Sequence, residues 1–159
     1  MAVQLCTFHL GPLFLGVEVS RVQEVLRQQE MTRVPLAPPA VCGLINLRGQ
    51  IVPAIELREC LQLEARAQGA PAMNVVVYTA GGAVSLIVDE VGDVMELSPA
   101  DFEAAPRTIP ARALEVIEGV YKLPNRLLLV VNVDRATALA CQVSTGTDTR
   151  NGRLIHAGA

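Results

Sequence analysis

Acidic side chains are the groups of this chain that could most readily perform acid–base chemistry. Asp89, Glu90 and Asp93 lie close together in the stretch "DEVGD", and Glu118 lies in "VIEG". Acid–base catalysis needs carboxyl groups that converge in one pocket and have separated pKa values. Adjacent residues of a strand point to opposite faces, so Asp89 and Glu90 cannot serve the same site. We interpret these carboxylates as solvated surface groups and predict that the chain is not an enzyme.

The other reactive side chains lack the neighbours that a catalytic or metal site requires. His9 lies in an alternating, strand-like pattern and His156 in a polar tail, so a histidine-centred site is not expected. The serines stand in no G-x-S-x-G context. The widely and irregularly spaced cysteines match no zinc pattern: Cys6, Cys42, Cys60 and Cys141. We predict four buried, reduced thiols and neither a metal nor another cofactor.

An arginine lies at a turn where no reaction explains it. The stretch "GLINLRGQIVPAIELR", residues 43–58, places Arg48 and Gly49 between two apolar segments that have the pattern of strands. An arginine in this position could form only a weak surface ion pair. It could equally be a contact residue, since arginine is enriched among the residues that dominate protein interfaces. The local pattern alone leaves both interpretations open.

The composition excludes several classes of protein. The 159 residues suffice for one domain, or for two very small ones with a shared core. Apolar residues make up 51% of the chain and aromatic residues 3%, so Val, Leu and Ala must fill that core. A net charge of -3 and scattered basic residues give no surface for nucleic acid. The N-terminus lacks a signal-peptide pattern and no apolar window could span a membrane, so we expect a soluble cytoplasmic protein without membrane insertion.

The order of apolar and turn-forming segments predicts a mainly β protein with short helices. We expect one domain over residues 1–141, followed by a polar, mobile tail at 142–159. Within the domain, a first unit covers about residues 1–63 and a small, polar linker covers 64–72. A second unit covers about residues 73–141 and ends in a helix from about residue 134 to 141.

The two units resemble each other. "GLINLRGQIVPAIEL" from Gly43 matches "GVYKLPNRLLLVVNV" from Gly119, which indicates an internal duplication. The matched positions include two glycines, two leucines and two turn residues: Gly43 with Gly119, Leu47 with Leu123, and Gly49 with Asn125. The first hairpin of each unit corresponds as well, with Gly11-Pro12 at the position of Gly81-Gly82. Gly and Asn both adopt left-handed backbone readily, so we expect matching turns.

The position of Arg48 breaks this similarity. The second unit has Pro124 there, so the fold can be built without the arginine. The role of Arg48 should therefore be sought in a contact with a partner.

Four segments in order resemble the CheW family of chemotaxis coupling proteins. They are "FHLGPLFLGVEVSRVQEVLR", "TRVPLAPPAVCGLINLRGQIVPAIELR", "SLIVDEVGDV" and "IEGVYKLPNRLLLVVNV". The similarity runs from about Leu5 to Leu139, and its most specific part is Gly-x-x-Asn-Leu-Arg-Gly followed by Val-Pro and Leu-Arg. The chain departs from the family pattern at Glu56, where Asp is usual, and at Glu18, in a strand that is commonly apolar.

The resemblance implies two five-stranded SH3-like β-barrels side by side and a function without catalysis. Such proteins bridge the cytoplasmic tip of a chemoreceptor to the regulatory domain of a CheA-type histidine kinase, in arrays at the membrane. The receptor tip is taken by the groove between the barrels, and the barrel ends pair with the kinase. We expect Glu24 to hold the guanidinium of Arg48, with Val22 and Val25 as apolar contact surface. The predicted receptor- and kinase-binding residues are Val22, Glu24, Val25, Asn46, Arg48 and Gly49.

A small-ligand-binding β-barrel protein is the alternative. That function needs an enclosed pocket with convergent polar groups. The sequence supplies small aliphatic residues and no evident polar cluster, so the adaptor is the favoured hypothesis.

Overall fold

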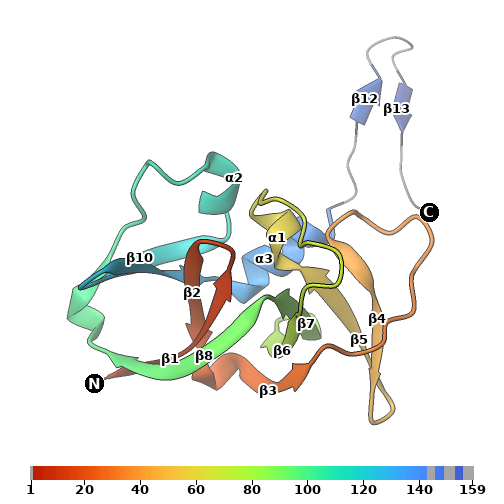
Figure 1. Cartoon of the computed structure of the whole chain (residues 1–159). Coiled ribbons are helices and arrows are strands. Elements are labelled where there is room, and N and C mark those ends of the chain that lie inside the picture. Colours follow the sequence, from red (N-terminus) through yellow and green to blue (C-terminus); the bar gives the residue numbers. More distant parts are fainter. Residues whose placement is uncertain (1, 143–145, 149–152, 156–159) are drawn as a thin grey trace.

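The computed structural model describes residues 2–142, 146–148 and 153–155, and it is built from two main β-sheets (Figure 1). The six-stranded sheet has the order β8-β1-β2-β11-β10-β9, with bounds β1 (Val3–Leu10), β2 (Leu13–Glu18), β8 (Glu90–Leu97), β9 (Phe102–Glu103), β10 (Ile117–Leu123) and β11 (Arg126–Val131). The five-stranded sheet has the order β3-β6-β7-β5-β4, with bounds β3 (Val22–Arg27), β4 (Val41–Leu47), β5 (Gln50–Glu56), β6 (Met73–Thr79) and β7 (Gly82–Val88). The predicted mainly β architecture is confirmed.

Short helices connect the strands. They are η1 (Val19–Arg21), α1 (Leu57–Cys60), η2 (Pro99–Asp101), α2 (Ala111–Leu114) and α3 (Val133–Ala140). The last is the predicted closing helix, and the side chain of Asn132 caps it by accepting a hydrogen bond from the Arg135 N–H at 2.9 Å. No helix among residues 2–142 is long and apolar enough to cross a membrane.

The predicted boundary between the barrels, at residues 64–72, is wrong. Each sheet takes strands from both halves of the chain: β1 and β2 pair with β8 and β11, whereas β6 and β7 pair with β3 and β5. The two units thus exchange their first hairpins. In each sheet the exchanged hairpin pairs with the other unit through one parallel strand pair, β2 with β11 and β7 with β5. A local apolar pattern identifies a strand but does not specify its partner strand, so this exchange could not be predicted from the pattern.

The similarity of the two units is confirmed in the strand register. An irregularity in β4–β5 lies between Val41 and Gly43, and one in β10–β11 lies between Ile117 and Gly119. A Cβ atom on Gly43 would lie 2.6 Å from the Thr32 carbonyl oxygen, and one on Gly119 would lie 2.6 Å from the Glu103 carbonyl oxygen. Both positions therefore require glycine for the same reason, a close approach of another backbone segment.

Two details of the predicted match need correction. Arg48 and Gly49 have positive φ values of 50° and 88°, whereas Asn125 is not among the described residues with positive φ, so the two turns differ. In the first hairpins, Leu10 pairs with Leu13 and Thr79 pairs with Gly82. The counterpart of Gly11-Pro12 is therefore Ala80-Gly81, one residue earlier than the sequence match suggested.

One apolar core joins the two sheets. It contains residues from both, such as Phe8 and Leu15 of the six-stranded sheet and Ile55 and Leu86 of the five-stranded sheet. Each sheet also has a smaller apolar cluster of its own, around Val76 in the five-stranded sheet and around Tyr121 in the six-stranded sheet. Because most apolar residues of both sheets bury against one another, the two sheets should unfold together.

An ion-pair cluster also joins the two sheets. Asp89, between β7 and β8, accepts hydrogen bonds from Arg58 of α1 at 2.5 and 2.9 Å and from Arg66 at 2.9 Å. It also accepts one from the Gly11 N–H at the β1–β2 turn, at 2.7 Å. Arg66 reaches Glu56 at 2.8 Å as well. Arg66 thus anchors the segment 64–72 to a charged cluster, which we name the Asp89 cluster.

The cysteines differ in exposure. Cys6 and Cys60 are buried and Cys42 is half-buried, but Cys141 is exposed, which corrects the expectation of four buried thiols. Burial raises the pKa of Cys60 to about 12, and burial together with the nearby Glu56 charge raises that of Cys42 to about 11. Thiolates are the reactive form, so both should react slowly at neutral pH.

We therefore predict that the exposed Cys141 reacts rapidly with a thiol reagent at pH 8, that the half-buried Cys42 reacts slowly, and that the buried Cys6 and Cys60 react only after unfolding. All four should titrate in denaturant without reductant, and a chelator should leave the melting temperature unchanged. A disulfide or bound metal in freshly purified protein would contradict this prediction.

Candidate functional site

The candidate site begins at the β4–β5 hairpin. Positive φ at both Arg48 and Gly49 is the backbone of a type I′ turn, whose twist suits a tight hairpin. The exposed Asn46 supports this turn, because its Oδ1 accepts a hydrogen bond from the Gly49 N–H at 3.0 Å. Asn46 and Gly49 therefore shape the turn that presents Arg48. Left-handed backbone is uncommon for arginine and often marks a functional position.

The predicted partner of Arg48 is confirmed. Arg48 Nη2 lies 2.5 Å from Glu24 Oε1, and this hydrogen bond raises the pKa of Arg48. The Arg48 side chain is 71% exposed and the Glu24 side chain only 22%. The strands β3 and β4 lie at opposite ends of the five-stranded sheet order, so the pair links its two edges. The guanidinium is oriented by Glu24 and still available to a partner.

The two predicted valines lie on the other face of β3. Val25 pairs with Val75 and Val22 with Val77, whereas Glu24 pairs with Val76, and directly paired residues share a face. Val75 and Val77 belong to the core between the sheets. Val22 and Val25 therefore lie at the margin of that core, and Val25 is 37% exposed. The six predicted residues share one region of the five-stranded sheet but not one surface.

Sequence reasoning missed two further valines, on β8. Val91 pairs with Phe8 and Val94 with Cys6, and both partners belong to the core between the sheets. Val94 is 57% exposed. The strands β3 and β8, both at a sheet edge, thus present equivalent valine pairs, and both run along the lower side of Figure 1. The signal was available in the repeat, since "VQEV" at 22–25 and "VGDV" at 91–94 share the same pattern.

The candidate catalytic carboxylates do not converge. Asp89 is bound by two arginines, which hold its pKa well below its usual range. Glu90 and Asp93 are exposed, and Glu118 accepts a hydrogen bond from Asn132 at 2.8 Å. Within residues 2–142, no group of three or more His, Cys, Asp or Glu side chains could hold a metal ion.

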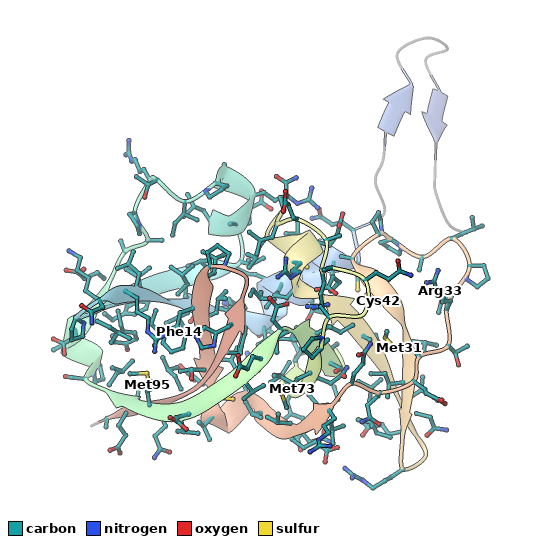
Figure 2. The ribbon with its side chains drawn as sticks, in the orientation of Figure 1. Phe14, Met31, Arg33, Cys42, Met73 and Met95 are labelled. Atoms are coloured by element: carbon teal, nitrogen blue, oxygen red, sulfur yellow. The ribbon has the colours of Figure 1, made fainter. Side chains whose placement is uncertain are left out.

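An open hollow of about 820 Å³ lies along the loop between β3 and β4. Figure 2 labels Met31, Arg33 and Cys42 among its lining residues. Leu36, on the same loop, is 83% exposed. The hollow is wide and formed largely by loop residues, so it does not match the enclosed pocket that a ligand-binding barrel requires.

Comparison with known proteins identifies the family. The family model described as "CheW-like domain" matches residues 4–140. The chain belongs to the CheW family. It is 32% identical to the chemotaxis protein CheW of Bacillus subtilis (strain 168) over 75% of this chain and 76% of that protein. It is 30% identical to that of Klebsiella aerogenes, over 80% and 77%.

A solved CheW structure has the same fold. The chain superposes on the scaffolding protein TtCheW from Thermoanaerobacter tengcongensis with a TM-score of 0.77, over 98% of both chains at 24% identity. The expected pair of SH3-like barrels is consistent with this similarity. As a member of the CheW family, the chain is a non-catalytic chemotaxis coupling protein, and the alternative of a small-ligand-binding β-barrel protein is not favoured.

Proposed function

We propose that this CheW-family chain bridges the cytoplasmic tip of a chemoreceptor to the regulatory domain of a CheA-type histidine kinase. It does so in the cytoplasm, within arrays recruited to the receptor-bearing membrane. By fixing receptor and kinase in one assembly, it lets a change in receptor conformation alter the phosphorylation rate of the kinase.

The observation that carries this proposal is the exposed Arg48 on a left-handed turn, oriented by Glu24. The second unit forms its own hairpin with Pro124 at the equivalent position, so folding does not account for the arginine. The valines of β3 and β8 form a separate, partly exposed apolar margin of the core between the sheets, on the face of β3 opposite Glu24. Arginine is enriched among interface hot spots, which supports a contact role for Arg48. We assign this region to the receptor tip and the barrel ends to the kinase.

A pull-down tests the proposal directly. The immobilised regulatory domain of a CheA-type kinase should retain the chain, and a soluble receptor tip should do so separately. Ligand-induced thermal stabilisation by small molecules, without binding of either protein, would instead support the ligand-binding function.

The C-terminal segment should be dispensable for this function. The prediction that residues 142–159 are mobile concerns mainly residues outside those that the structure describes. The described strands β12 (Gly146–Asp148) and β13 (Arg153–Ile155) form a two-stranded sheet separate from the other two. Truncation after Cys141 should leave the melting temperature and kinase binding unchanged within error, because the polar composition cannot bury a core. Loss of either property would show that the segment docks on a barrel.

A further inference from the structure

A small hollow of about 180 Å³ opens at the six-stranded sheet, away from Arg48 and its turn. The cluster beneath it also contains Phe14, and Met95 packs against that cluster (Figure 2). Its lining comes from β1, β2, η2, β9, β10 and β11: Val3, Leu5, Glu18, Pro99, Phe102, Glu118, Tyr121 and Val130. The hollow is therefore mostly apolar, with two carboxylates and one phenol.

The two carboxylates carry uncompensated charge. Neither Glu18 nor Glu118 takes part in an ion pair with any side chain of residues 2–142. Asn132 donates one hydrogen bond to Glu118 Oε1. The other carboxylate oxygen of Glu118, Oε2, accepts no hydrogen bond from residues 2–142. Arg21 lines an adjoining hollow together with both glutamates, but its guanidinium is bound to Asp134. The hollow thus offers two exposed carboxylates that no cationic side chain of residues 2–142 pairs with.

Tyr121 adds a second, independent feature that indicates a ligand. Tyr121 as a residue is only 4% exposed and lines the hollow. Its hydroxyl group is not among the fully buried atoms that lack a partner, and it forms no hydrogen bond with any described residue. Burial raises the pKa of this hydroxyl, and the charges of Glu18 and Asp101 raise it further. The Phe102 ring lies 5.4 Å from the Tyr121 ring, tilted by 56°. Aromatic rings beside carboxylates favour a cation, which the ring faces attract.

The equivalent position of the other barrel shows that folding does not require these charges. The strand registers of the two barrels can be matched position by position. In the five-stranded sheet, the residues equivalent to Glu18, Glu118 and Tyr121 are Ile87, Cys42 and Ile45, respectively. Ile45 and Ile87 are buried in the cluster of the five-stranded sheet, and Cys42 packs against it. The same architecture is thus completed with apolar side chains in one barrel and left open and acidic in the other.

We propose that this hollow binds an aliphatic ammonium group, an activity additional to the proposed bridging function of the chain. The ammonium lies between the carboxylates of Glu18 and Glu118 and donates to the Tyr121 hydroxyl oxygen. The hydrocarbon part packs on Leu5, Val130 and the Phe102 ring. The ammonium can belong to a free alkylamine or to a lysine side chain of a partner protein.

The test is a titration of the isotope-labelled chain with n-butylammonium chloride, followed by amide NMR at constant ionic strength. Saturable shifts should concentrate at Val3, Tyr121 and Val130, and n-butanol at the same concentrations should not reproduce them. Glu18→Gln/Glu118→Gln should weaken binding at least tenfold, and Tyr121→Phe should weaken it about threefold. Glu115→Gln, which removes an exposed carboxylate outside the hollow, should have no effect.

A second titration distinguishes the sources of the ammonium group. Capped Gly-Lys-Gly and Gly-Gln-Gly peptides replace butylammonium. Saturation by butylammonium assigns the site to free amines, and saturation by the lysine peptide alone assigns it to a partner side chain; either result supports the proposal. Failure of both probes to saturate, equal binding of n-butanol, or unchanged binding in a folded Glu18→Gln/Glu118→Gln variant would overturn it.

Discussion

Replacing Arg48 with Ala should weaken the assembly of receptor, chain and kinase about thirtyfold, the loss expected for an interface hot spot. The physical reason is that the guanidinium is 71% exposed, is already oriented by Glu24, and has no second partner among residues 2–142. Folding should suffer little, since exposed ion pairs contribute little to stability. Receptor and kinase binding should be measured separately, alongside a thermal melt.

The control for this prediction is Arg27→Ala, which removes an exposed arginine of β3 that forms no ion pair among the residues that the structure describes. It should leave binding unchanged. Glu24→Ala should cause part of the Arg48→Ala loss, because the freed guanidinium samples other rotamers. The double variant should be less impaired than the sum of the singles, as expected for an interacting pair. Unchanged binding in Arg48→Ala would exclude the contact role, and a collapsed melt would make Arg48 a structural residue.

Replacing Asp89 with Asn should destabilise the fold by about 2 kcal/mol, because two arginines would keep their partial burial and lose the carboxylate that compensates them. For a chain of this length the melting temperature should fall by about 4–8 °C. The Arg58 and Arg66 side chains are only 15% and 13% exposed, so water cannot fully replace the lost partner. Asp93→Asn, at an exposed site four residues away, is the matched control and should melt like the parent chain.

The contribution of Asp89 should depend on pH in one direction. Its pKa in the folded chain is depressed, so its stabilisation is present above the unfolded pKa of about 3.9 and is lost as pH falls toward the folded value. The difference in stability between the parent and Asp89→Asn should be constant near pH 7 and should shrink below about pH 4. Denaturant unfolding at several pH values measures this difference. A difference that grew in acid would contradict the assignment.

The sequence predicted those features that depend on neighbours along the chain or on the internal repeat. The Arg48–Gly49 turn, the closing helix and the equivalent glycines at 43 and 119 belong to this group, because each reflects local backbone requirements. The Arg48–Glu24 pair was also predicted, although Glu24 lies in β3 and Arg48 in the turn between β4 and β5.

The features that depend on strand pairing were not accessible. The exchange of hairpins between the units places β1 beside β8, and no local sequence pattern predicts this strand pairing. The Asp89 cluster follows from the same exchange, since it joins α1, residue 66 and the β1–β2 turn. Val91 and Val94 were missed for a different reason: their pattern repeats that of Val22 and Val25, but only the pairing shows that both strands lie at sheet edges.

Co-sedimentation of a CheA-type kinase with receptor-bearing vesicles tests the bridging function most directly. The kinase and receptor should come from the organism that encodes this chain, and the chain should be the only variable. Sedimentation of the kinase should rise with added chain and saturate, and Arg48→Ala should require a higher concentration for the same effect. Kinase sedimentation that is independent of the chain, or a chain that sediments with the receptor without bringing the kinase, would contradict the proposed bridge.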